Sequence, residues 1–438
     1  MDEKGTAILN RLSSDRAEQV ACSRFFGNAS VRSAGLISES VARCGRVASG
    51  KHVLCIADTT ELNYQSHAGR LDKTDQDLGP VGNDHDIGFF LHPTLAVDAE
   101  SEFPLGFSSI YCWNRSFDKL DKHERNYKRL PIEEKESYRW IVSSQESQQH
   151  LADATQITII ADREGDIYEE FAMVPDERTH LLIRSKSDRL LYDEEANLFA
   201  YLSSQPVAGT YSIKLKGDKR IKRKSGKALI EVRYTKVKIK CPQNSASKSR
   251  LPDFVELYVV EAQEHPSTVS LKEKPIGWRL LTTHVVENFS VACQMIKWYS
   301  LRWLIEQLFR TLKSEGLEIE ASQLEKGSAL KKLAIMALQV ALKIMQLVQE
   351  RDGKAGVDAG VVFGNNEIEL LEKVCKRYEG KTKKQKNPYQ KKSLAWAAWT
   401  IARIGGWKGY QSESPPGPVT MKRGLQDFHI MMIGWGLT

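Results

Sequence analysis

The sequence predicts an α/β protein whose core contains a mixed sheet. In the first part of the chain, short apolar β-prone runs alternate with helix-prone segments in the order β-β-β-α-β-α. A block of further strand-like runs follows between residues 179 and 285, separated by Gly, Pro and Lys-rich turns. After residue 286 the apolar residues recur at helical spacing. A chain of 438 residues with these changes of pattern is expected to form two or three structural units.

The predicted domain boundaries follow these changes of pattern. Short helical segments with Ser and Gly breaks occupy the N-terminal region, and the α/β core consists of two separated stretches. A β-rich insertion interrupts the core, and a helical region ends the chain. The expected bounds are 1–50 for the N-terminal region, 51–178 plus 286–325 for the core, 179–285 for the insertion and 326–438 for the C-terminal region.

Two apolar strands of the predicted core each lead into an aspartate. The run HVLCIADTT at residues 52–60 places Asp58 near the end of a buried strand, and ITIIA at 157–161 is followed at once by Asp162 and a helix-prone segment. α/β sheets usually place ligands at the carboxyl ends of their strands. The alternative is that each aspartate is a helix cap or turn residue, which is the more common role for a lone Asp.

The remaining predicted elements are strands before the insertion, strands within it and helices after it. Residues 88–98 and 104–113, joined by a polar turn at 99–102, indicate an antiparallel meander with the first strand, and residues 119–149 are helix-prone. Within the insertion the strand-like runs are LLIRSK, YSIKLK, ALIEVRYTKVKIK, FVELYVV and WRLLTT. Two long amphipathic helices are expected near residues 292–313 and 329–349.

A stripe of polar residues runs along the first of these predicted helices. At about 100° per residue they fall within an arc of roughly 80°, opposite a continuous apolar face. The stripe consists of Tyr299, Arg302, Glu306, Arg310 and Lys313. One interpretation is an ordinary surface with pairs four residues apart, each worth about 0.2–0.5 kcal/mol. The other is a carboxylate that holds a metal ion between cations that hold phosphates.

Asp58, Asp162 and Glu306 together form a candidate metal site. Three carboxylates can bind two Mg²⁺ ions about 3.5–4 Å apart, which is the arrangement used for phosphoryl displacement. Hard oxygen ligands without nearby Cys or His favour Mg²⁺ or Mn²⁺ over zinc. The three residues are far apart in sequence, so the site exists if the fold brings them together.

Composition excludes several other classes of protein. No run reaches the roughly 18 apolar residues of a membrane span, and the first residues have no apolar signal-peptide core. The seven Cys form no Cys-x-x-Cys pair, which argues against a disulfide framework and fits a reducing cytoplasm. The net charge of +7 is modest, but residues 214–227 and 376–392 carry eight cations each. Such runs are solvated loops or, beside an acidic site, contacts for a polyanion.

The motifs around these residues resemble those of a known family, the bacterial DDE transposases of the IS-four family, in the group of the transposon Tn-five transposase and its inhibitor. The matching segments are IADTTELNY around Asp58, IADREGDIYEEF around Asp162, LIRSKSDR around Arg184, GWRLLTT around Trp278 and YSLRWLIEQLFRTLK around Glu306. The last contains the family's Tyr-x2-Arg-x3-Glu-x6-Lys signature, and SLAWAAWTIARIGGW near the C-terminus is also similar.

The resemblance implies a ribonuclease-H-like core with a β-rich insertion, a helical C-terminal dimerisation region and cut-and-paste transposition through a DNA hairpin. It further implies that Asp58, Asp162 and Glu306 are catalytic metal ligands and that the protein acts on double-stranded DNA as a homodimer. Phosphate contacts are implied for Tyr299, Arg302, Lys313, Arg184 and Lys186, with Arg310 on the same stripe, and base stacking for Trp278. Without the family, Trp278 reads as a core aromatic residue.

One departure from the family concerns the N-terminus. The family carries a helical domain that recognises transposon ends ahead of the segment that reads here CSRFFGNASV, and few residues precede Cys22. We therefore expect mainly non-specific DNA binding in the bacterial cytoplasm, at the nucleoid. Two alternatives to an active transposase stay open: a truncated regulator that inhibits full-length transposase by forming heterodimers, and a stand-alone metal-dependent nuclease. The shortened N-terminus favours the regulator, whereas the intact triad favours the transposase.

Overall fold

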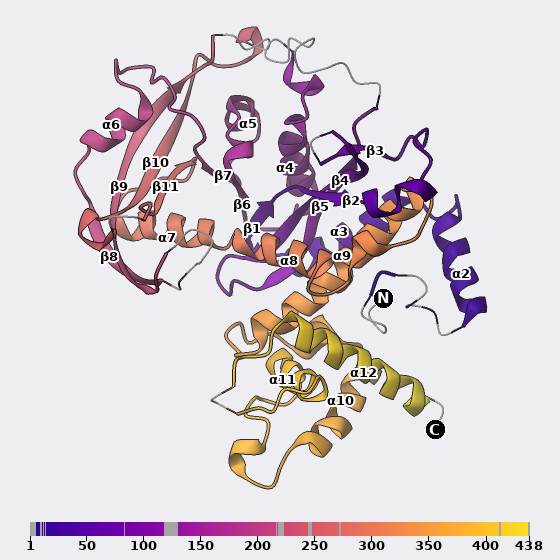
Figure 1. Cartoon of the computed structure of the whole chain (residues 1–438). Helices are drawn as coiled ribbons and strands as arrows, with labels where there is room; N and C mark the ends of the chain where they lie inside the picture. Colours follow the sequence, from indigo (N-terminus) through magenta and orange to yellow (C-terminus); the bar gives the residue numbers. More distant parts are fainter. Residues whose placement is uncertain are drawn as a thin grey trace. The chain divides into compact units, whose positions relative to one another are not determined.

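The structure is a computed structural model, and its described residues form two compact units. Unit 1 comprises Met1–Val47, Thr59–Lys119 and Leu304–Thr438, and unit 2 comprises Ala48–Asp58 and Leu120–Trp303. Each unit is therefore assembled from separate stretches of the chain (Figure 1). The described residues are 6–8, 11, 13, 15–82, 84–117, 130–215, 217, 223–243, 248–270, 273–410 and 413–436.

Unit 2 is organised around a sheet of parallel and antiparallel strands. Its parallel part consists of β1 (His52–Ala57), β6 (Gln156–Ala161) and β7 (Thr179–Arg184), paired in that order. The sheet continues antiparallel from β7 through β11 (Gly277–Thr282), β10 (Phe254–Glu264), β9 (Gly226–Lys240) and β8 (Gly209–Leu215). β1 and β6 are mostly apolar and are buried from their second residue onward, because both of their faces are covered. These strands were all predicted, and the strands of the expected insertion extend the same sheet as β1 and β6.

Helices cover both faces of this sheet. Trp140, on α4 (Tyr138–His150), lies beside the β6–α5 loop at Gly165, whereas Trp298, on α7 (Phe289–Ser300), contacts His52 of β1 edge-to-face. Side chains alternate between the two faces along a strand. Asp58 and Asp162 therefore lie on the α7 side, with His52 and Thr158. The further helical elements of unit 2 are α5 (Tyr168–Met173), α6 (Leu198–Ser204), η3 (Ile132–Glu134), η4 (Arg163–Gly165), η5 (Lys248–Arg250) and η6 (Pro266–Thr268).

Two helices of unit 2 differ from the sequence prediction. The short helix α6 lies within the predicted β-rich insertion and was not expected. The helix-prone stretch 119–149 is helical from Tyr138, and its residues before 130 lie outside the described residues. The mixed sheet with its flanking helices is compatible with a ribonuclease-H-like core, as predicted.

Four strands of unit 1 pair antiparallel with one another. β4 (Asp86–Asp98) pairs with β2 (Thr60–Asn63), β3 (Gly79–Val81) and β5 (Pro104–Trp113). The β4–β5 hairpin was predicted, and its turn ends at Glu102, whose φ of 60° is unusual for a residue other than glycine. An Asp98 carboxylate stabilises the turn by accepting hydrogen bonds from the Glu100 amide and the Ser101 hydroxyl.

The helices of unit 1 surround α9 (Gly327–Glu350). This helix is long and apolar enough to cross a membrane by length and composition, but 67% of its most apolar window is buried inside the protein. It packs against α2 (Arg16–Gly27), β5, α11 (Leu394–Ile404) and α12 (Pro418–Gly436), so it serves as the core helix of the unit. The other helical elements are α3 (Ser33–Ala48), α8 (Trp303–Lys313), α10 (Asn365–Tyr378), η1 (Gln65–Arg70), η7 (Ile319–Ala321), η8 (Ala359–Val361) and η9 (Lys383–Gln385).

The predicted single helix over residues 292–313 was wrong. α7 ends at Ser300 and α8 begins at Trp303. Between them, the Leu301 and Arg302 amides donate to carbonyls three residues back, at Trp298 and Tyr299. These tighter bonds interrupt the α-helical ladder. The polar stripe is therefore divided between two helices.

The apolar side chains of the SLAWAAWTIARIGGW segment, in the region where the family resemblance implies dimerisation, are buried and do not form a contact surface. Leu394, Trp396 and Trp399 are 0%, 4% and 7% exposed, because α11 packs into the core of unit 1 against α9, α10 and α12. The exposed apolar side chains of the C-terminal region lie instead on α12, where Ile430 and Ile433 are 61% and 57% exposed.

Candidate functional site

Asp58 and Asp162 lie at neighbouring positions at one edge of the unit 2 sheet. β1 and β6 are parallel, with His52 opposite Gln156 and Ile56 opposite Ile160. The same register carries the two aspartates side by side, each just past the end of its strand. Two aspartates from segments far apart in sequence thus follow neighbouring parallel strands at the same end of the sheet.

Each aspartate has one oxygen engaged by a named partner. Asp58 Oδ2 accepts a hydrogen bond from Nη1 of Arg302 at 2.9 Å, and the two side chains are only 20% and 16% exposed. Asp162 Oδ1 accepts from the Glu164 amide at 2.8 Å and so caps the short helix η4. Capping, the alternative interpretation of Asp162, is therefore real, but it occupies one of the two carboxylate oxygens.

Tyr299 lies beside these acids at the end of α7. It is 3% exposed, and burial raises the pKa of its phenol. The positive charges of Arg302 and Arg184 act against this rise in pKa, whereas the Asp162 carboxylate adds to it. The phenol of Tyr299 therefore lies in the electrostatic field of both arginines and of Asp162.

Trp278 and Arg184 complete the cluster around Tyr299. The indole of Trp278 contacts the Tyr299 ring edge-to-face, with centroids 5.2 Å apart and planes at 71°. Trp278 is half-buried, unlike the core aromatic residue that its apolar context suggested. Arg184 hydrogen-bonds to the Tyr299 hydroxyl and also donates to the Gly277 carbonyl at 3.2 Å. Unit 2 therefore brings together Asp58, Asp162, Arg184, Trp278, Tyr299 and Arg302.

Lys186 follows β7 in a short segment beside this cluster. Its side chain is exposed, and it forms no ion pair with the residues that the structure describes. Its backbone amide, by contrast, is held by the Asp166 carboxylate at 2.7 Å. The backbone of Lys186 is thus fixed, while its side chain is free to contact a ligand.

The other predicted site residues lie on α8, in unit 1. Glu306 is partly exposed near the start of the helix. Nζ of Lys313 lies 3.2 Å from Oε1 of Glu320, and this carboxylate also accepts from the Asn63 amide. Arg310 is half-exposed and lies 3.8 Å from Glu315.

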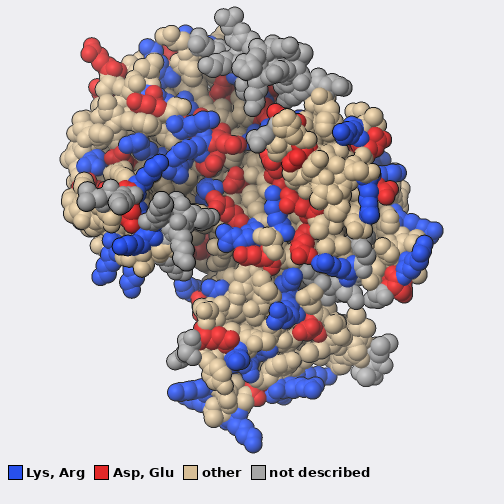
Figure 2. Space-filling view, in the orientation of Figure 1, with Lys and Arg blue, Asp and Glu red and all other residues tan. Residues whose placement is uncertain are grey.

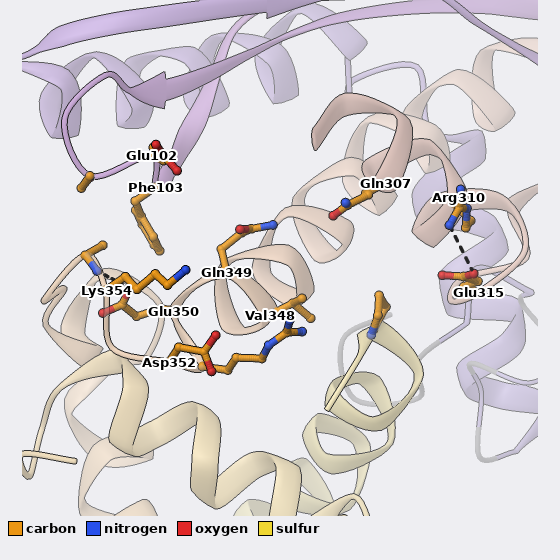
Figure 3. A pocket seen from close by; sticks show the side chains of 14 residues that line it. Glu102, Phe103, Gln307, Arg310, Glu315, Val348, Gln349, Glu350, Asp352 and Lys354 are labelled. Carbon is orange, nitrogen blue, oxygen red and sulfur yellow. Dashed lines mark hydrogen bonds and ion pairs between the residues drawn. The ribbon is translucent and has the colours of Figure 1, made fainter. Parts of the chain in front are cut away.

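Arg310 also lines a cavity of about 370 Å³ in unit 1 (Figure 3). The cavity lies between the β4–β5 turn, α8 and the end of α9. Its walls carry the acidic residues Glu102, Glu315, Glu350 and Asp352 together with the basic residues Arg310, Arg351 and Lys354. A mixed lining of this kind has no strong preference for a polyanion.

The two basic runs of the sequence differ in the structure. Most of the run at 214–227 lies outside the described residues, and its Arg223 is buried in a two-oxygen pair with Glu264 at 2.5 and 2.6 Å. Arg223 therefore stabilises the fold, and neither interpretation of the run, a solvated loop or a polyanion contact, describes this residue. The run at 376–392 is exposed, and Figure 2 shows Lys and Arg gathered over this part of unit 1.

The side chains of unit 2 have the right chemistry for a hard divalent cation, and they supply two of the three predicted carboxylate ligands. Asp58 and Asp162 supply carboxylate oxygens at one sheet edge, and no Cys or His lies among the residues of this cluster. Among the residues that the structure describes, no group of three His, Cys, Asp or Glu side chains is placed to hold a metal. The guanidinium of Arg302 supplies a positive charge next to Asp58.

Two further groups in unit 2 were not assigned a role from the sequence. Asp166 and Arg189 form a buried ion pair. They end the motifs DREGD and SKSDR, and their opposite charges were the only sign in the sequence that they could pair. His52, His180 and His284 gather around Thr158 below Trp298, and no spacing in the sequence links them.

Residues 143–342 match the family model of the transposase DDE domain. The match supports a DDE transposase. It spans α4 to most of α9 and contains Asp162, the Tyr299 cluster and α8, whereas Asp58 lies before it. A DNA substrate and a general use of divalent metals accompany this family.

Proposed function

We propose that the protein is a metal-dependent DNA transposase of the IS-four family, similar to that of transposon Tn-five. Asp58, Asp162 and Glu306 hold two Mg²⁺ or Mn²⁺ ions, and Tyr299, Arg302, Arg310, Lys313, Arg184, Lys186 and Trp278 contact DNA. The observation that carries the proposal is the placement of Asp58 and Asp162 at adjacent strand ends, beside Arg302, Tyr299, Arg184 and Trp278.

The proposed reaction is a series of phosphodiester exchanges. Water breaks a phosphodiester bond at the transposon end and leaves a 3′-hydroxyl. That hydroxyl attacks the opposite strand, closes a hairpin and expels the flanking strand; a second water opens the hairpin, and the 3′-hydroxyl then attacks target DNA. Bound divalent ions would activate the attacking oxygen and stabilise the leaving oxygen.

The side chains near the two aspartates suit the remaining tasks. Arg184 and Arg302 are positive charges that can hold phosphates on either side of the reacting one, and fixed charges preserve the orientation of the attacked phosphorus. Trp278 is half-buried against Tyr299, so its outer face can stack on a base that leaves the duplex during hairpin formation. A stand-alone nuclease needs no such stacking residue.

Homodimer formation is part of this proposal. The C-terminal region supplies an exposed apolar surface on α12, at Ile430 and Ile433, in place of the buried SLAWAAWTIARIGGW segment. An inhibitory regulator would use the same surface to form heterodimers but would not cleave DNA. The transposase and the regulator hypotheses therefore predict the same dimer surface and different catalytic activity.

The test is Mg²⁺-dependent nicking of a duplex by the Glu306→Gln variant. Glutamine keeps the shape of the side chain but lacks the charge that holds a metal. We expect nicking to disappear while DNA binding survives. Gln307→Glu adds a carboxylate at the next exposed position of α8 and serves as the control. We expect that adding it to Glu306→Gln does not restore nicking. Nicking by Glu306→Gln at the wild-type rate would reject the triad.

A further inference from the structure

Asp166 is a buried carboxylate with a fixed counter-charge. Its side chain is 0% exposed, and that of its partner Arg189 is 12% exposed. Oδ1 accepts hydrogen bonds from Nε and Nη2 of Arg189 at 3.0 and 2.5 Å, and Nη2 also donates to the Asp166 carbonyl. A buried charge is strongly destabilising when its partner is removed, so this pair holds its two segments together.

The second oxygen of Asp166 binds backbone. Oδ2 accepts from the Lys186 amide at 2.7 Å and from the Ser187 amide at 3.3 Å. Hydrogen bonds from backbone amides to a carboxylate are charge-assisted and stronger than neutral ones. The Asp166 side chain thus connects the loop after β6 to three groups in the segment after β7: the amides of Lys186 and Ser187 and the guanidinium of Arg189.

The segment that holds Lys186 is fixed on its other sides as well. The Ser185 amide donates to the Arg279 carbonyl of β11, and Asp188 accepts from the Phe199 amide at the start of α6. The Lys186 side chain nevertheless points to solvent and has no ion-pair partner in the described part of the chain. A fixed backbone beneath an unpaired lysine reduces the conformational entropy lost when the lysine binds a ligand.

We propose that Asp166, through its pair with Arg189, is a positioning residue that holds Lys186 in place for a DNA phosphate. The inference rests on the proposed function. Asp166 belongs to the same five-residue loop as Asp162, whose Oδ1 caps that loop through Glu164. The loop that carries the proposed metal ligand Asp162 therefore also fixes the backbone of Lys186. The metal ion and the bound phosphate are thus held at a constant distance from each other.

The experiment is a double-mutant cycle on DNA affinity with Asp166→Asn and Lys186→Ala. Asparagine has no negative charge and only one acceptor oxygen. If this oxygen accepts from the Lys186 amide, the NH₂ group faces Arg189 and the ion pair is lost. The readouts are the dissociation constant for a short duplex, its dependence on salt, and hydrogen exchange of the 185–189 amides. Glu164→Gln is the matched control, because Glu164 lies in the same loop, is 61% exposed and pairs with Arg139 instead.

We expect Asp166→Asn to speed exchange at Lys186 and Ser187 and to reduce the salt slope by about 0.9, the value for one phosphate contact. Lys186→Ala should cause the same loss of affinity, and the double variant should lose no more than either single variant. Glu164→Gln should leave all three readouts unchanged. Arg189→Lys, which keeps a charge but loses the two-nitrogen geometry, provides the same test if Asp166→Asn does not fold.

Two outcomes would overturn the inference. One is a loss of affinity on Asp166→Asn that is as large in the Lys186→Ala background as in the wild type, which means that Asp166 acts on the fold in general. The other is unchanged exchange and salt slope. By contrast, a wild-type protein that neither binds nor nicks DNA would reject the proposed function itself.

Discussion

Arg302 and Asp58 are 244 positions apart in sequence, yet their side chains meet at 2.9 Å. Arg302 stands between α7 and α8, and Asp58 follows β1. Both side chains are largely buried, so the guanidinium neutralises a carboxylate that water reaches poorly. Under the proposed function, the same guanidinium would hold a DNA phosphate next to this carboxylate.

The first prediction concerns phosphate contacts. Arg302→Ala and Lys313→Ala should each weaken binding to all DNA sequences alike and reduce the salt slope by about 0.9, because a phosphate contact acts through counterion release. Binding of a duplex measured between 50 and 200 mM salt checks this, with the exposed Lys73→Ala as the control. An unchanged slope for both variants would assign the two cations to structure.

The second prediction concerns the metal. Mn²⁺ or Mg²⁺ should raise the melting temperature of the wild type, because a ligand that binds the folded state stabilises it. Asp162→Asn and Asp58→Asn should abolish this increase, since an amide is a far poorer ligand for a hard cation. Glu164→Gln, two residues from Asp162, should retain it. An equal increase in all of these proteins would place the metal elsewhere.

The third prediction concerns Glu170, a fully buried acid on α5. Burial raises its pKa to about 8, and the Asp166 charge adds to the rise, whereas a hydrogen bond from Ser144 opposes it. The folded state therefore keeps the proton between pH 4.5 and 8 while the unfolded state releases it. Stability should fall as pH rises through this window, by at most about 1.4 kcal/mol per unit from this group.

Glu170→Gln removes the titrating group and keeps the hydrogen-bonding shape. Urea unfolding from pH 5 to 9 should show a smaller decline in the free energy of unfolding for this variant than for the wild type. The exposed Glu177→Gln, just beyond the end of α5, should follow the wild type. A Glu170→Gln variant with the wild-type decline would show that Glu170 is ionised in the folded protein.

The fourth prediction concerns the histidine cluster around Thr158. Burial lowers the pKa of His284 to about 3, and the neighbouring His180 and His52 lower it further. The unfolded state binds a proton below about pH 6.5, whereas the folded state binds it only near pH 3. Stability should therefore be complete above pH 6.5 and decrease as pH falls towards 3.

His284→Gln should reduce this acid sensitivity, because it removes the proton-binding group but can still hydrogen-bond to Thr158, which lies 2.8 Å from the imidazole. The free energy of unfolding between pH 4 and 7 measures the effect, and the more exposed His265→Gln is the control. Equal acid sensitivity in the wild type and His284→Gln would assign the acid transition to other groups.

Local sequence pattern predicted much of the fold, because strand and helix formation depend on apolar periodicity. The strands from β1 to β11 that carry the predicted site residues, the β4–β5 hairpin and α9 were all expected from runs of apolar residues and turn signals. Asp58 and Asp162 were recognisable for the same reason: each is the first acid after a buried strand. The short helix α6 was missed because its seven residues are too few to show a helical period.

The tertiary structure decided which of these residues meet. From the sequence, the natural partner of Arg302 is Glu306, one helical turn away. In the structure the helix is interrupted at Leu301 and Arg302, and Arg302 pairs with Asp58, 244 positions earlier in the chain. The parallel register of β1 and β6, set by long-range backbone pairing, places Asp58 beside Asp162. Burial of Trp396 and Trp399 likewise depends on α9, α10 and α12, which no pattern within α11 specifies. Chain-local forces thus determined the elements, and contacts between distant segments determined the partners.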